Sequence, residues 1–301
     1  MKTKTILFVI AGIFLGIFLS FTERYFANDH ENLLAFKENI KIFAVNIPQN
    51  PSFANETVPI DRFYVKEALE REITVNAYFH SASILIIKKA NRWFPVIEPI
   101  LKKYNIPDDF KYLAVAESAL ENVVSPAGAS GFWQLMKTTA KEYNLEVNED
   151  IDQRYDIELA TEAACKYLQK SYEKYGNWTM VAASYNAGMG RIDTELQRQK
   201  HTNYYDMSFG VETGRYIYRI IALKAMLQNP TDYGFIIRDE DKYNTFQLKS
   251  IIIDSAISDI PAFAKKHNLT YKEFKIYNPW IRQVYLANAS GKKYRIQLPQ
   301  H

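Results

Sequence analysis

The sequence predicts a mainly α-helical protein that ends in a small α+β unit. Over residues 61–228, apolar side chains recur at every third or fourth position, which is typical of amphipathic helices. After Pro230 the pattern changes, because residues 246–252 and 292–299 alternate apolar and polar side chains as strands do. Between these strands, residues 258–279 carry the pattern of two short helices. A strand–helix–helix–strand unit of this size is typical of a small domain.

These patterns divide the chain of 301 residues into six predicted parts. An apolar leader precedes a polar segment, a long helical region and the α+β unit. The predicted parts are a signal or membrane anchor (1–21), a tether (22–60), a helical N-terminal extension (61–103), the main helical domain (104–230), a linker (231–243) and the α+β module (244–301).

Residues 6–21 form an uninterrupted apolar run behind the basic residues Lys2 and Lys4. A run of this length is long for the core of a signal peptide and slightly short for a bilayer span. The positive-inside rule keeps both lysines in the cytoplasm and exports the rest of the chain. We therefore predict a cell-envelope protein on the periplasmic side, anchored in the inner membrane by residues 6–21 or released after signal cleavage.

Composition excludes several classes of protein. The formal net charge of +3 is small and no dense stripe of Lys and Arg is present, so nucleic acid is not an expected partner. The single Cys165 excludes an intramolecular disulfide framework, and its Ala-rich surroundings predict a small buried residue. The sequence has no metal motif, nucleotide-binding loop or nucleophile triad. We therefore expect neither a cofactor nor a metal.

Local residue choices predict where the helices begin and end. Pro95 and Pro99 interrupt one helical run, so two short helices are expected there. Elsewhere Asp and Asn at the start of a run can cap the first free backbone amides, and Gly can end a helix. The predicted N-caps are Asp108, Asp156 and Asn177, and the predicted ends are at Gly176 and Gly188.

One acidic residue stands out for its surroundings. Glu117 ends an apolar helical run and shares a predicted face with Leu113 and Leu120. Burial beside apolar groups disfavours the ionised carboxylate and raises its pKa, as the proton donor of a glycoside-cleaving enzyme requires. Glu121 lies on the same face if the helix continues that far, and its charge would raise the pKa further. Taken alone, a residue such as Glu117 is more often an ordinary surface acid at a helix end.

Four sequence blocks follow one another in a recognisable order. They are Glu117-Ser118, SPAGASGFWQLM at 125–136, ASYNAGMGRI at 183–192 and ETGRYIYRI at 212–220. With these blocks, residues 107–222 resemble the catalytic domain of lytic transglycosylases of the soluble-lytic-transglycosylase (SLT) type. Within that type they are most similar to the membrane-bound murein transglycosylase D group.

The resemblance implies a lysozyme-like helical catalytic domain that acts on peptidoglycan. This family cleaves the β-1,4 bond between N-acetylmuramic acid and N-acetylglucosamine without water. Glu117 would first act as acid towards the glycosidic oxygen and then as base towards the C6 hydroxyl of the muramic acid, giving a 1,6-anhydro product. Two alternatives stay open: a lysozyme-type muramidase that hydrolyses the bond, and a catalytically silent peptidoglycan-binding scaffold.

The resemblance also implies roles for five further residues. Ser125 would touch the substrate near its acetamido group, and Gln134 would donate to the sugars. Tyr185 would orient Glu117 through a hydrogen bond. The remaining two shape the cleft, with Asn186 at its floor and Glu212 on the opposite wall.

Other residues near these blocks have two interpretations. Trp133 and Trp178 either stack on sugar rings or belong to the core, and the core is the more frequent place for tryptophan. Asp152 and Asp156 are expected to cap helices and hold loops rather than to catalyse. The glycines of the blocks serve either turn geometry or the site itself: Gly128, Gly131 and Gly188.

The C-terminal module resembles a degenerate LysM module, which binds peptidoglycan and chitin. Residues 259–281 and the strand at 294–299 carry this resemblance. The implied partners are peptidoglycan glycan strands, the membrane through the N-terminal apolar segment, and other cell-wall enzymes.

Overall fold

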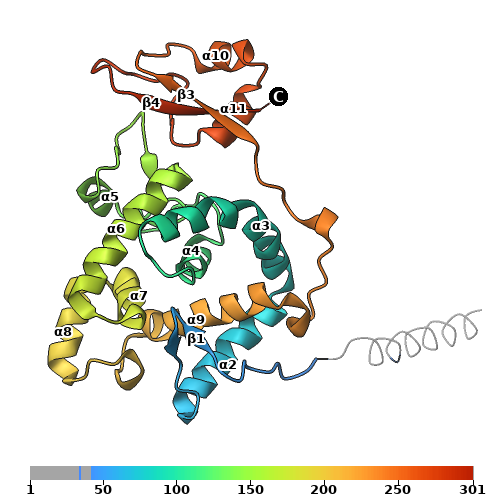
Figure 1. Cartoon of the computed structure of the whole chain (residues 1–301), viewed down its shortest axis with the longest axis vertical. Helices are drawn as coiled ribbons and strands as arrows, with labels where there is room; N and C mark the ends of the chain where they lie inside the picture. The colour runs from blue at the N-terminus through green and yellow to red at the C-terminus, as the bar shows by residue number, and fades with distance from the viewer. Residues whose placement is uncertain (1–33, 35–41, 301) are drawn as a thin grey trace, which may run out of the picture. The chain divides into compact units, whose positions relative to one another are not determined.

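The computed structural model describes residue 34 and residues 42–300 (Figure 1). In that part of the chain no helix is both long and apolar enough to cross a membrane. The predicted anchor at 1–21 lies outside the described residues, as does most of the predicted tether before residue 42. The predicted fold class is confirmed: helices dominate, and a small βααβ unit follows them.

The main helical domain contains helices α2 to α9, joined by loops and short 3-10 turns (Figure 1). Helix α9 contacts α2, α4 and α7, so it runs through the centre of this domain. The helices are α2 (Phe63–Tyr78), α3 (His80–Lys103), α4 (Phe110–Ser118), α5 (Lys137–Glu142), α6 (Ile157–Tyr175), α7 (Trp178–Ala187), α8 (Met189–Gln199) and α9 (Val211–Gln228).

Most predicted helix ends are confirmed. The Asp156 carboxylate accepts hydrogen bonds from two backbone amides at the start of α6, and Asn177 accepts one at the start of α7. Gly176 ends α6 with a φ of +64°, and Gly188 ends α7 with a φ of +82°. These ends depend on residues within one turn of the boundary, so local sequence is sufficient to predict them.

The prediction of Asp108 as the N-cap of α4 was wrong. Asp109 occupies the N-cap position, and its side chain does not cap the helix. Asp108 instead pairs with Lys111, one turn along the chain. Asp109 accepts from the backbone N–H of Ala54 at 2.7 Å and from Lys224 Nζ at 2.7 Å. A local ion pair thus engages the Asp108 carboxylate, and contacts with distant segments engage that of Asp109.

The two short helices predicted around Pro95 and Pro99 are one continuous helix, α3. A proline inside a helix removes one N–H and leaves the carbonyl four residues earlier without its partner. Pro95 and Pro99 are four residues apart and both are exposed, so the affected backbone lies on the solvent side. On the opposite side, Ile97 and Leu101 are fully buried and hold the helix against the core.

Residues 51–60 differ from the predicted tether. Strands β1 (Ser52–Phe53) and β2 (Glu56–Thr57) form a small antiparallel hairpin that packs into the main domain. Phe53 is fully buried, and its ring centroid lies 5.1 Å from that of Phe110. Residues 51–60 are structured because their apolar side chains are buried against the folded domain, although the segment as a whole is polar.

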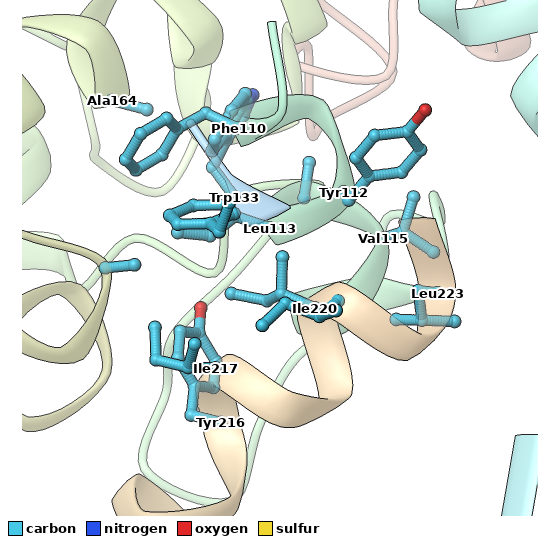
Figure 2. Packing of buried hydrophobic residues seen from close by; sticks show 14 of the residues in the cluster. Phe110, Tyr112, Leu113, Val115, Trp133, Ala164, Tyr216, Ile217, Ile220 and Leu223 are labelled. Atoms are coloured by element: carbon cyan, nitrogen blue, oxygen red, sulfur yellow. The ribbon is translucent and has the colours of Figure 1, made fainter. Parts of the chain in front are cut away.

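The core of the main domain forms where α4 crosses α9. Figure 2 shows Leu113 and Val115 of α4 beside Ile220 and Leu223 of α9, and all four side chains are buried. Because α4 is short, this packing rather than helix propensity holds its C-terminal end in place. That end carries Glu117.

The C-terminal module has the predicted strand–helix–helix–strand order. Strand β3 pairs antiparallel with β4, from Leu248 opposite Pro299 to Ile253 opposite Tyr294. Phe274, Leu286 and Ile296 are fully buried in its core. The elements are β3 (Leu248–Ile253), α10 (Ile260–Lys266), α11 (Tyr271–Tyr277) and β4 (Tyr294–Pro299).

This module also contacts the main domain directly, through buried side chains and backbone hydrogen bonds. Ile151 of the main domain is buried within the core cluster of the module. The backbone N–H of Asp152 donates to the Trp280 carbonyl at 2.8 Å, and that of Arg282 donates to the Asp150 carbonyl at 2.8 Å. The small separate domain suggested by the sequence therefore shares part of its core with the helical domain.

Candidate active site

Glu117 lies in the last turn of α4, where the chain changes direction. The helix ends at Ser118, and Ala119 and Leu120 then take left-handed backbone conformations with φ of +52° and +58°. Leu120 is buried by this turn rather than by a continuing helical face. The turn leaves Glu117 partly buried at the end of an otherwise buried helix.

The prediction that Glu121 acts on Glu117 from the next helical turn was wrong. Because α4 ends at Ser118, Glu121 lies beyond the helix, and its side chain is 54% exposed. Its carboxylate accepts from Lys89 Nζ at 2.7 Å. Glu121 is therefore a surface ion-pair residue.

The environment of Glu117 favours the protonated carboxyl. Burial raises its pKa to about 7, and the negative charge of Glu212 adds to this effect. A hydrogen bond from the Tyr216 hydroxyl to Glu117 Oε1 and the positive charge of Arg219 act in the opposite direction. Near neutral pH the carboxyl can therefore both give up and take back a proton.

The hydrogen bond to Glu117 comes from Tyr216, a residue that the sequence did not single out. Tyr185 was predicted to orient Glu117, but its hydroxyl donates to the Trp133 carbonyl at 2.6 Å. Tyr216 makes the predicted contact instead. Tyr185 is close enough for the Glu117 carboxylate to raise its pKa, in addition to the larger effect of burial. The available signal was helical spacing, since Tyr216 lies four residues after Glu212 in the same block.

Ser125 and Gln134 hold the loop between them. Ser125 Oγ accepts from the backbone N–H of Ala129 at 3.0 Å. Gln134 has a φ of +46°, and its Nε2 donates to the Gly131 carbonyl at 2.8 Å and to the Val123 carbonyl at 3.0 Å. Both side chains therefore make hydrogen bonds with the main chain, and their contacts with substrate stay predictions.

A buried arginine, Arg154, also holds the loop between Ser125 and Gln134 in place. Arg154 Nη1 donates to the Gly128 carbonyl at 2.8 Å and to the Leu135 carbonyl at 3.1 Å. Asp152 binds the Arg154 guanidinium, with Nη2 donating to Oδ2 at 2.7 Å, so the loop-holding interpretation of Asp152 is confirmed. A Cβ on Gly131 would lie 2.0 Å from the Arg154 carbonyl oxygen, and its φ is +81°, so this position requires glycine.

The remaining predicted residues connect α7 and α9 or lie in the core. Asn186 Oδ1 accepts from Thr213 Oγ1 at 2.9 Å, which links the two helices. Glu212 is 65% exposed, and its Oε1 accepts from Arg219 Nη1 at 3.1 Å. Trp133 is fully buried and donates to Thr161 Oγ1 at 2.8 Å, as the core interpretation predicts.

Trp178 is also structural. Its ring stacks on Tyr172, with centroids 4.0 Å apart, and meets the edge of Phe110. Cys165 is fully buried, as predicted. Over the described residues, no group of three or more His, Cys, Asp and Glu side chains is arranged to hold a metal ion.

Two known families match this chain. Residues 95–208 match the Transglycosylase SLT domain, and residues 249–301 match the soluble lytic transglycosylase C-terminal LysM-like domain. The chain therefore carries an SLT domain followed by a LysM-like domain, and both predicted resemblances are confirmed. Glu117 lies within the first match, whereas Tyr216 and Arg219 lie beyond its end.

Relatives with assigned names agree with this classification. The chain is 26% identical over 243 residues to the membrane-bound lytic murein transglycosylase D of Escherichia coli K12. The aligned region covers 79% of this chain and 52% of that protein. The chain thus spans about half the length of this relative. It is 32% identical over 108 residues to the soluble lytic murein transglycosylase of the same strain, covering 32% of this chain and 17% of that protein.

The chain is also similar to solved structures of soluble lytic transglycosylases. The 70 kDa soluble lytic transglycosylase of Escherichia coli is 25% identical and superimposes with a TM-score of 0.39. The matched part covers 51% of this chain and 27% of that one.

Proposed function

We propose that this protein is a peptidoglycan lytic transglycosylase. It cleaves the β-1,4 bond between N-acetylmuramic acid and N-acetylglucosamine and leaves a 1,6-anhydromuramic acid end. The proposal rests above all on Glu117, a partly buried acid with a pKa of about 7 that accepts a hydrogen bond from Tyr216. The SLT match around it and the names of the relatives support the same reaction.

Glu117 has two successive roles in this proposal. The protonated carboxyl donates its proton to the glycosidic oxygen as the bond to C1 breaks. The resulting carboxylate then takes the proton from the C6 hydroxyl of the same sugar, whose oxygen attacks C1 and closes the anhydro ring. A pKa near neutrality suits both steps, because neither protonation state is strongly disfavoured.

The surrounding residues have supporting roles in this proposal. Ser125 and Gln134 lie on the loop that Arg154 anchors, where they can meet the sugars. Asn186 and Glu212 contribute from α7 and α9 to the walls around Glu117. Tyr185 supports the site through its hydrogen bond to the Trp133 carbonyl.

The cellular setting is part of the proposal. We propose a place in the cell envelope, with residues 1–21 as membrane anchor or export signal and the LysM-like module as a second contact with the glycan strands. The name of the membrane-bound relative and the LysM-like match support this setting. Other cell-wall enzymes are further candidate partners.

Digestion of purified sacculi tests the proposal. Incubation with the protein should release muropeptides lighter by one water than the products of hydrolysis, as measured by mass spectrometry. Glu117→Gln keeps the size of the side chain but removes the exchangeable acid, so turnover should fall by roughly 10²–10⁴-fold. Glu121→Gln is the matched control, because this neighbouring acid is exposed and paired with Lys89.

Other results of the same digestion would contradict the proposed reaction and indicate a different function. Reducing ends among the products would identify a muramidase that uses water. Binding to sacculi without release of muropeptides would identify a silent scaffold. Continued cleavage by Glu117→Gln would remove Glu117 from the mechanism.

A further inference from the structure

A short hairpin, residues 146–153, lies between the LysM-like module and the loop that carries the predicted substrate contacts. The backbone N–H of Gln153 donates to the Glu146 carbonyl at 2.9 Å, and Val147 pairs with Asp152 through an antiparallel β-bridge. The mechanism proposed above uses no residue of this hairpin. Its contacts on both sides nevertheless connect the module with that loop.

The junction between the hairpin and the module is buried. Ile151 of the hairpin pairs with Ile281 of the module through a β-bridge, and both side chains are buried. Beside this bridge, the backbone N–H of Asp152 donates to the Trp280 carbonyl at 2.8 Å. Buried apolar side chains keep water away from such a hydrogen bond, so it holds the two parts in one register.

Side chains of the module hold the rest of the hairpin. The Tyr294 hydroxyl and Lys292 Nζ donate to Glu146 Oε2 at 3.0 Å and 2.9 Å. The Tyr285 hydroxyl donates to Asp150 Oδ1 at 3.0 Å. The first strand, the turn and the second strand of the hairpin therefore each contact the module.

Arg154 follows the hairpin directly and links it to the active-site loop, residues 125–135. Its Nε and Nη2 donate to the two carboxylate oxygens of Asp152 at 2.9 Å and 2.7 Å. Its Nη1 donates to the carbonyls of Gly128 and Leu135 at 2.8 Å and 3.1 Å. Because a bidentate pair fixes the plane of a guanidinium, Asp152 directs Nη1 towards the loop.

The active-site loop is also fixed to the helix end that carries Glu117. The next residue, Ser118, is buried, and its Oγ donates to the Phe132 carbonyl of the loop at 2.8 Å. Ser125 and Gln134 belong to the same loop. A shift of the loop would therefore move both side chains relative to Glu117.

We propose that the LysM-like module positions the active-site loop through the 146–153 hairpin, and that Arg154 is the positioning residue that transmits this support. The inference rests on the proposed function, in which Ser125 and Gln134 of the loop meet the sugars. In these terms the module supports cleavage through contacts within the chain, in addition to any contact of its own with glycan.

Hydrogen–deuterium exchange of the full chain, measured by mass spectrometry, tests the inference without relying on activity. Ile281→Ala removes the buried side chain at the junction, so the amides of residues 125–135 should exchange roughly 10-fold faster than in the parent. Ile260→Ala is the matched control, because Ile260 is equally buried but lies on α10 of the module. A general loss of stability would accelerate loop exchange in both variants, whereas the proposal predicts this effect only for Ile281→Ala.

The role of Arg154 is tested by a conservative variant and by combining variants. In Arg154→Lys the charge remains, but one ammonium group cannot serve Asp152 and both loop carbonyls, so loop exchange should also rise by roughly 10-fold. Ile281→Ala should add little in this background, because both substitutions weaken the same connection. Arg198→Lys, at an exposed guanidinium that pairs with Glu195 on α8, is the control and should leave loop exchange unchanged.

Two results would overturn the inference. Loop exchange that is unchanged in Ile281→Ala, or raised equally in Ile260→Ala, would remove the role of the module. Fully additive effects of Ile281→Ala and Arg154→Lys would remove Arg154 from the connection. If one of these variants fails to fold, judged by circular dichroism, Ile281→Val and Asp152→Asn replace them with the same expected direction of change.

Kinetics on soluble glycan strands separate this inference from the proposed function. Arg154→Lys should raise KM more than it lowers kcat, because it displaces the side chains that meet the sugars and leaves Glu117 in the protein. A lower kcat with an unchanged KM would contradict the positioning role. If the parent protein does not cleave these strands, the proposed function fails, whereas the exchange experiment still decides whether the module positions the loop.

Discussion

At the scale of single residues, the chemistry depends on what surrounds one carboxyl. Burial at the end of α4 disfavours the Glu117 carboxylate, and the Tyr216 hydroxyl and the Arg219 charge stabilise that carboxylate in part. The balance holds its pKa near 7, well above the ordinary glutamate value of 4.5. Such a balance costs stability, because the folded protein must ionise this group in an unfavourable place.

This cost predicts a pH-dependent effect of Glu117→Gln on stability. The folded pKa lies above the unfolded value, so the protonated carboxyl stabilises the fold fully below about pH 4.5, and this contribution is lost as the pH rises through 7. At about pH 8 the glutamine variant should therefore be more stable than the parent, by up to about 3 kcal/mol. Urea unfolding at about pH 8 and about pH 4 measures the difference.

The two pH values distinguish this effect from a general change in packing. The stability difference should shrink towards zero at the lower pH, where the parent is also uncharged at this position. An exposed acid, Glu240, provides the control through Glu240→Gln. A difference of equal size at both pH values would contradict the proposed environment of Glu117.

At the scale of elements, the β1–β2 hairpin acts as a cap for a distant helix. The Glu56 carboxylate accepts from the backbone N–H of Trp178 at 2.6 Å and of Thr179 at 2.8 Å, and from Thr179 Oγ1 at 2.7 Å. Asn177 accepts from the next amide, that of Met180. The first free amides of α7 are thus satisfied partly by a residue more than a hundred positions away.

Glu56→Ala should therefore destabilise the protein by about 1–2 kcal/mol, the usual effect of losing a helix N-cap. The loss arises because two backbone amides and one hydroxyl lose their acceptor, and a favourable charge at the start of α7 disappears. Chemical unfolding of the full chain measures it. Glu67→Ala, at an exposed position on α2, is the control and should change stability little. Equal effects of the two substitutions would show that Glu56 does not cap α7.

At the scale of the whole described chain, the helical domain and the LysM-like module share buried residues. Ile281 of the module is fully buried and pairs through a β-bridge with Ile151 of the helical domain. A shared core couples the unfolding of two parts, because neither can open without exposing apolar surface of the other.

Ile281→Ala should destabilise the protein by about 2–4 kcal/mol and leave a single unfolding transition at a lower temperature. Differential scanning calorimetry measures both features. Ile276→Ala, at a half-exposed position on the same module, is the matched control and should have a small effect. Two separate transitions, with only the module shifted, would show that the domains unfold independently.

Features that depend on near neighbours could be predicted from the sequence. Helical periodicity, the caps Asp156 and Asn177, the ends at Gly176 and Gly188, and the βααβ order all follow from residues a few positions apart. The ordered blocks around Glu117 predicted the SLT match for a similar reason, since each block is a short contiguous pattern. Local chemistry of this kind is present in the chain before it folds.

Which distant residues come into contact depends on tertiary packing. Tyr216 rather than Tyr185 donates to Glu117 across 99 positions of sequence, and no local pattern distinguishes these two tyrosines. The continuous helix through Pro95, the buried Phe53 and the ion pair of Glu72 with Arg219 likewise depend on packing between distant segments. Burial sets the pKa of Glu117, and burial exists only once α4 and α9 have packed together.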